Sequence, residues 1–108
     1  MNYSLDKYTT HVKGENRGNI VMFTLNNCPW CRKTKQLLNT IGVEYSYVDI
    51  DCAAREDRQR LMETLEKWNP ACIFPTVVIN KDQCISGHNQ FRIREALEKH
   101  QSTVDKEN

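Results

Sequence analysis

The sequence predicts an α/β domain with the element order βαβαββα, in which helices flank a mixed four-stranded sheet. Two patterns carry this prediction. Strand-like runs at 20–25 and 44–50 enclose a helix-like stretch at 29–41, and elements joined this closely form a parallel βαβ unit. Residues 76–79 and 83–86 are separated by a turn so short that it permits only an antiparallel hairpin.

The first half of the chain supplies the βαβ unit. Residues 20–25 form a continuous apolar run, which is typical of a strand buried on both faces. The following helix begins at Pro29, carries apolar residues at helical spacing and ends at Gly42, a residue type common just past a helix. Upstream, residues 1–19 form an N-terminal extension in which Tyr8–Val12 is a candidate edge strand.

A second helix is expected over about 53–68, between the two halves of the sheet. Asp51 is a suitable cap for its first turn, and Leu61 and Leu65 lie on the face expected to turn inward. The helix should end before Pro70, because a proline disfavours helical backbone in the residue that precedes it.

The last predicted helix runs from Phe91 to roughly residue 100, with Asn89 as its cap. Its apolar residues, Phe91 among them, are expected to be at least partly buried against the sheet. We therefore expect the main domain to cover residues 20–101, and residues 102–108 to form a polar tail.

Composition excludes several classes of protein. A chain of 108 residues forms one domain, and its net charge of +1 suggests neither a nucleic acid nor an anionic membrane as partner. No apolar run approaches the ~18–20 residues that a membrane span needs, and the N-terminus lacks the apolar segment of a signal peptide. We therefore expect a cytoplasmic protein, where structural disulfides are rare. The odd number of cysteines, 5, also argues against a disulfide framework.

Redox chemistry is predicted at Cys28-Pro29-Trp30-Cys31, between the first strand and the helix that follows. Residues three apart share one helical face with Cβ atoms about 5–6 Å apart, so a small adjustment allows a disulfide. Cys28 precedes the helix, where free backbone N–H groups and the helix dipole favour a thiolate. Cys31 lies one turn further on, and we expect it to face the core and act as the resolving thiol.

Together with a proline directly before a Thr-Val-Val-Ile strand, this motif resembles the glutaredoxin branch of the thioredoxin-like fold, over about residues 20–100. Its Cys-Pro-Trp-Cys is close to the Cys-Pro-Tyr-Cys of dithiol glutaredoxins. Residues 73–76 stand where that family has a cis-proline loop, and residues 86–90 where it has a Gly-rich turn. The resemblance implies thiol–disulfide exchange by Cys28 and Cys31, with disulfide-containing proteins or small disulfides as targets.

Five residues around this pair are expected to bind the substrate. If the Phe74–Pro75 bond is cis, as the resemblance implies, the Phe74 backbone is free to pair with an extended peptide or tripeptide. Gly87 and His88 belong to the turn that the family places beside the thiols, and Trp30 offers apolar surface for docking.

Two departures from the family pattern bear on the electron donor. Many relatives that use glutathione carry a lysine three residues before the first cysteine, where this chain has Leu25. Their second turn glycine and the acidic residues after it are replaced here by His88, Asn89 and Gln90, so the acidic partner for the glutathione amine is missing. Glutathione therefore remains a candidate cosubstrate beside a flavin or iron–sulfur reductase as donor, and no tightly bound cofactor is expected.

A metal-binding module is the alternative interpretation. Cys28 and Cys31, taken with Cys84 and His88, have a spacing seen in zinc sites, and a variant of this idea is a dimer that bridges an iron–sulfur cluster through Cys28. Against a metal site, Pro75 would crowd the thiols and the first pair opens a helix. The redox interpretation is therefore preferred, with no metal ligands expected.

The remaining cysteines receive separate expectations. Cys52 is expected to be a structural residue that caps a helix, and Cys84 to lie half-buried in a strand. Cys72, three residues before Pro75, should lie near the active-site loop, where it is a candidate third redox thiol as well as a plain structural cysteine.

Overall fold

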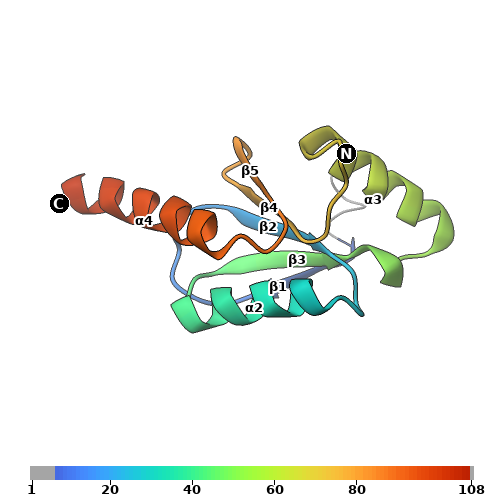
Figure 1. Ribbon diagram of the computed structural model, residues 1–108, viewed down its shortest axis with the longest axis horizontal. Helices are drawn as coiled ribbons and strands as arrows, with labels where there is room; N and C mark the ends of the chain where they lie inside the picture. Colours follow the sequence, from blue (N-terminus) through green and yellow to red (C-terminus); the bar gives the residue numbers. More distant parts are fainter. Residues whose placement is uncertain (1–6, 108) are drawn as a thin grey trace.

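The structure is a computed structural model that describes the backbone of residues 7–107 and the side chains of residues 7–98. Its sheet has five strands in the order β1-β3-β2-β4-β5 (Figure 1). The elements, in chain order, are β1 (Thr9–Val12), β2 (Ile20–Thr24), α2 (Pro29–Ile41), β3 (Tyr45–Asp49), the 3₁₀ turn η1 (Ile50–Cys52), α3 (Arg55–Trp68), β4 (Thr76–Ile79), β5 (Gln83–Ser86) and α4 (Gln90–Glu107).

The strand pairings confirm both topological predictions. Strands β2 and β3 are parallel, as a βαβ unit requires, and β4 and β5 form an antiparallel hairpin. The expected count of four strands was one short, because the candidate edge strand forms β1 and pairs antiparallel with β3. That stretch is too short and too weakly patterned to be assigned as a strand before its pairing with β3 is known. In the structure Val12 packs against the apolar core.

Two apolar clusters fill the space on either side of the sheet. Helices α2 and α4 cover one face, where the buried side chains include Leu38 and Leu97. Helix α3 covers the other face with Leu61 and Leu65, as the spacing of these leucines predicts. Figure 1 shows the sheet running between these helices, with the thiol-bearing turn at the end where α2 begins.

The start of helix α3 differs from the expectation. The start of α3 has Ala54 as its N-cap, with no side-chain hydrogen bond, so the expectation that Asp51 caps it was wrong. The chain makes a 3₁₀ turn directly after β3, which shifts the start of the helix and puts Cys52 in an exposed turn instead of at a cap. Helix α2 ends as predicted, at Gly42 with φ 87°.

The last helix is longer than expected. Its backbone continues to Glu107, because residues 101–107 contain neither glycine nor proline to stop it. Residues 102–107, expected as a polar tail, therefore extend α4, while the division at 20–101 stays a prediction. Phe91 is 74% exposed, so its expected burial was wrong; the face that α4 turns to the sheet begins at Ile93. No helix in the described part of the chain is long and apolar enough to cross a membrane.

Candidate active site

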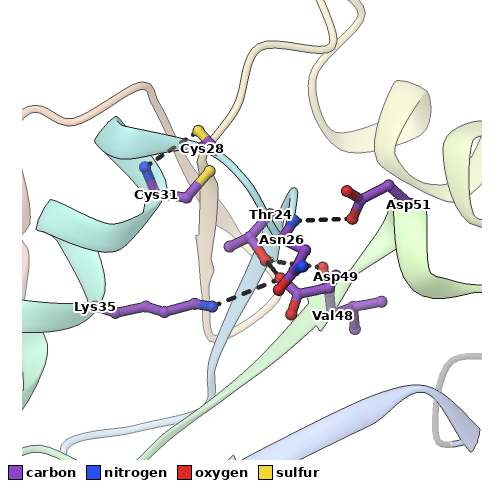
Figure 2. Close-up of polar contacts among 8 residues, drawn as sticks. All are labelled: Thr24, Asn26, Cys28, Cys31, Lys35, Val48, Asp49 and Asp51. Atoms are coloured by element: carbon purple, nitrogen blue, oxygen red, sulfur yellow. Dashed lines mark hydrogen bonds and ion pairs between the residues drawn. The ribbon is translucent and has the colours of Figure 1, made fainter.

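The junction between β2 and α2 holds Cys28 in the position that the sequence predicts. Cys28 is the N-cap of α2, in extended backbone with φ −128° and ψ 111°, and Pro29 is the first helical residue. The Cys28 Sγ accepts a hydrogen bond from the Cys31 backbone N–H at 3.2 Å (Figure 2). The first turn of α2 contains no acidic residue. The backbone amide and the helix dipole therefore both favour negative charge on this sulfur.

Cys31 lies one turn deeper, and its side chain is only 1% exposed. The pKa of the Cys31 thiol is raised to about 12, chiefly by burial and then by its hydrogen bond to the Cys28 side chain and the nearby Cys28 charge, while Lys35 acts in the opposite direction. In the reduced protein Cys31 is therefore a protonated thiol at neutral pH. The two cysteines thus differ as an attacking and a resolving thiol must.

A polar network lies beneath the thiol pair, and sequence reasoning missed it. The Lys35 Nζ lies 3.5 Å from the Asp49 Oδ1 (Figure 2). Thr24, fully buried, donates its hydroxyl proton to this same carboxylate and to the Val48 carbonyl. The network ties the end of β2, the end of β3 and the second turn of α2 together. Its one sequence signal is that Lys35 stands four residues after Cys31, on the same helical face.

The loop before β4 carries the Phe74–Pro75 bond, which is cis, as the resemblance implies. The Pro75 carbonyl accepts a hydrogen bond of 2.7 Å from the Gly87 N–H, so this loop and the turn after β5 are joined. Asn69, which sequence reasoning treated only as a helix end, holds the base of the loop. Its buried Nδ2 donates to the Thr76 and Ser86 hydroxyls, each at 3.0 Å.

His88 and Trp30 lie together at the mouth of the site. Their ring centroids are 5.9 Å apart and their planes are inclined by 27°, while Trp30 remains 55% exposed. The buried Thr34 hydroxyl donates to the Trp30 carbonyl at 3.1 Å and meets the His88 Nδ1 at 2.8 Å. Since the single hydroxyl proton is used on the carbonyl, His88 must donate from Nδ1. Its Nε2 is therefore the ring atom that is left for other partners.

The structure does not assemble the zinc-like set of ligands. Cys84 lies within β5, opposite Val78 of β4, and His88 is engaged with Thr34. Among residues 7–98, no three side chains of the types His, Cys, Asp and Glu are grouped so that they could hold a metal ion. The metal-binding interpretation therefore has no support from the geometry.

The expected site residues fall into two groups. Cys28 contacts Cys31, Trp30 from the same helix start stacks on His88, and Gly87 is hydrogen-bonded to Pro75. Phe74 instead packs half-buried in the cluster beneath α3, beside the half-buried Cys72.

Comparison with known proteins gives a consistent result. The glutaredoxin family model matches residues 20–85, more than half of the chain. Glutaredoxin-1 of Oryctolagus cuniculus is 31% identical over 71 residues, which make up 65% of this chain and 66% of that protein. Glutaredoxin-1 of Sus scrofa is 32% identical over 71 residues, with the same coverage of 65% and 66%. This chain thus spans just under two thirds of the length of these curated relatives.

Solved structures agree over a larger share of the chain. The crystal structure of Methanosarcina acetivorans methanoredoxin superposes with a TM-score of 0.75 at 40% identity, covering 78% of this chain and 88% of that one. The glutaredoxin from Methanosarcina mazei Go1 gives a TM-score of 0.76 at 38% identity, covering 83% of this chain and 87% of that one. With the thiol pair, the cis-proline loop and the sheet order in place, the chain belongs to the glutaredoxin family of thiol oxidoreductases.

Proposed function

We propose that this protein reduces disulfides in proteins or small molecules through Cys28 and Cys31. The Cys28 thiolate attacks one sulfur of the target, forming a mixed disulfide and expelling the other target sulfur as a thiolate, which takes a proton from water. Cys31 then loses its proton and attacks the Cys28 sulfur. That step releases the second target thiolate, which takes up from water the equivalent of the proton that Cys31 gave up, and leaves a Cys28–Cys31 disulfide, so two electrons have moved from the protein to the target.

The observation that carries this proposal is the contrast between the two sulfurs. Cys28 is half-buried at the helix start and accepts the Cys31 N–H, whereas Cys31 is buried and protonated. An attacking thiol needs access to solvent and a stabilised thiolate, while a resolving thiol needs only to reach its neighbour. We propose that Trp30, Phe74, Pro75, Gly87 and His88 contact the substrate, which is supported by the stacking of Trp30 on His88 and by the hydrogen bond between Gly87 and Pro75.

Two candidates are considered for the source of electrons, glutathione and a reductase. Glutathione is the cosubstrate typical of the glutaredoxin family. Here, however, the side chain at the lysine position is Leu25, which packs half-buried against an apolar cluster, and the turn at 87–90 carries no carboxylate. We therefore propose that a flavin or iron–sulfur reductase serves at least as well as glutathione. We also propose a cytoplasmic location, since all five cysteines, 28, 31, 52, 72 and 84, are free thiols.

Two serine variants test the mechanism. Cys28→Ser should abolish the reduction of insulin disulfides, because it removes the nucleophile. Cys31→Ser should keep the first attack and accumulate a mixed disulfide with the target, visible as an adduct by mass spectrometry under non-reducing conditions. Full turnover by the Cys28→Ser protein would rule the mechanism out.

The donor is tested by a coupled assay on the wild-type protein. One arm supplies glutathione with its reductase, and the other supplies a thioredoxin-reductase-type enzyme, with the same disulfide target in both. Turnover in the second arm at or above the rate of the first supports the proposed donor. Turnover with glutathione alone would refute it and leave the dithiol mechanism intact.

A further inference from the structure

A groove of about 220 Å³ lies between helix α2 and the first turns of α4, and its lining on α2 begins at Lys33, further along the helix than the thiol pair. It is continuous with the site already described, because His88 lines it and stacks on Trp30. Lys33 also lines it, and its Nζ lies 4.7 Å from the centroid of the Trp30 ring. The groove is lined by Lys33, Gln36, Leu37, Thr40, His88, Gln90 and Arg94.

The lining has positive charge and no negative charge. Lys33 and Arg94 are its charged side chains, no carboxylate is among the lining residues, and within residues 7–98 neither cation is paired with one. His88 must donate from Nδ1 to Thr34, which leaves its Nε2 for a ligand. The first turn of α4, which begins at the groove with Gln90, also lacks acidic residues. Every fixed charge and helix end at the groove thus favours an anion.

The size of the groove decides what kind of anion fits. Pockets that hold whole small molecules usually measure about 300–1,000 Å³, so about 220 Å³ suits a side chain or two of a larger target. Apolar surface is exposed next to the groove, because Trp30, which stacks on His88, is 55% exposed. An apolar contact beside a polar, charged rim is the composition typical of a protein–protein contact.

We propose that this groove selects protein targets in which acidic residues flank the disulfide, by binding their carboxylates between Lys33 and Arg94. This inference rests on the proposed function, since it names the class of target that the thiol pair reduces. It adds a charge requirement that the thiols alone do not impose. The target disulfide would lie over Cys28, with its neighbouring carboxylates one to two helical turns along α2.

The test uses two disulfide-bonded peptides that differ only in charge. One carries glutamates and the other glutamines at the positions that follow the cysteine, and kcat/KM is measured for both with the full-length protein. An exposed ion pair is worth about 0.2–1 kcal/mol, so the ratio of the two values should lie between about 1.4 and 5 in low salt. It should fall toward one in about 1 M salt, where the screening length is about 3 Å.

Two arginines of α4 provide a matched pair of variants. Arg94→Gln should bring the ratio for the glutamate and glutamine peptides to about one. Arg92→Gln removes the same charge from the same helix but from outside the groove, where the arginine acts on Cys84 of β5, so the ratio should be kept. Circular dichroism of both variants confirms that the fold is intact.

The outcomes separate this inference from the function on which it rests. Equal kcat/KM for the two peptides with the wild-type protein would overturn the acidic-target proposal while the reductase function stands. Equal loss of preference in the Arg92 and Arg94 variants would also overturn it, since net charge and not the groove would then be responsible. Failure to reduce either peptide, or insulin, would overturn the proposed function and the inference together.

Discussion

Replacing Cys31 with alanine isolates the effect of burying this thiol on the stability of the protein. The pKa of Cys31 rises from 9.0, the value of an unperturbed thiol, to about 12 in the folded protein. Between these two values the unfolded chain has lost the proton and the folded protein still holds it. The unfolded state is then favoured as pH rises, so the stability that Cys31 confers is complete below pH 9 and declines above it.

The size of this loss of stability follows from the same pKa shift. Each pH unit in this window should lower the free energy of unfolding by about 1.4 kcal/mol, with a ceiling of about 4 kcal/mol by pH 12. The full effect of about 4 kcal/mol requires that solvent does not reach Cys31, and Cys31 is only 1% exposed. In Cys31→Ala this contribution is absent, so the difference between the two proteins isolates it.

The assay is urea unfolding of both proteins with a non-thiol reductant, at intervals from pH 8 to pH 11. The difference in the free energy of unfolding between wild type and Cys31→Ala should be constant up to about pH 9. It should then shrink by about 1.4 kcal/mol for each further pH unit. Parallel curves up to pH 11 would refute the reasoning, because Cys31 would then titrate as it does in the unfolded chain.

Three further substitutions test the surroundings of the site. Thr34→Val leaves the His88 Nδ1 without its buried acceptor and should lower the free energy of unfolding by about 1–3 kcal/mol. Thr40 is exposed, so Thr40→Val should have almost no effect, and equal effects of the two substitutions would contradict the role of Thr34 in holding His88. Asn69→Ala removes three hydrogen bonds at the base of the cis-proline loop, two donated by Nδ2 and one accepted by Oδ1 from the Ala71 N–H. It should therefore lower the free energy of unfolding by about 2 kcal/mol and reduce kcat/KM for insulin, whereas full activity would show that the loop is held by other contacts. Phe91→Ser should change the free energy of unfolding by less than about 0.5 kcal/mol, because Phe91 is 74% exposed. Ile93→Ala, at a buried position on the same helix, should lower it by about 2–5 kcal/mol. Thermal denaturation measures both, and a large loss of stability in Phe91→Ser would contradict the exposed position of this ring.

The parts of the fold that could be predicted are those that local patterns determine. The apolar run at 20–25 and the short loops on either side of α2 leave only a parallel pairing of β2 and β3, and that pairing is present. The position of Cys28 follows from Pro29, whose fixed backbone marks the first residue of a helix. Each of these inferences needs only a few neighbouring residues.

The parts that could not be predicted depend on strand register and on the exact place where a helix starts. Thr24 meets Asp49 because β2 and β3 pair in one particular register, which no single stretch of sequence specifies. Phe91 has the composition of a core residue, yet α4 begins so that its inward face opens at Ile93. An apolar residue in the first turn of a helix therefore says little about burial until the orientation of the helix is known.

The contact between His88 and Trp30 is another feature that could not be predicted from the sequence. His88 follows Gly87, which has φ 77° and turns the chain out of β5, and the direction of that turn decides what the imidazole meets. The sequence places His88 near the thiols through the resemblance alone. It does not indicate that Thr34, buried in α2, would fix the ring by accepting a hydrogen bond from Nδ1.

The most direct test of the account is the rate at which iodoacetamide modifies each cysteine of the reduced protein at pH 6, followed by peptide mass spectrometry. N-acetylcysteine in the same tube is the reference, since an ordinary thiol with a pKa near ~8.5 is almost wholly protonated at this pH. The account predicts that Cys28 reacts faster than this reference and that Cys31 stays unmodified. A Cys28 that reacts no faster than N-acetylcysteine, or a Cys31 that reacts first, would contradict it.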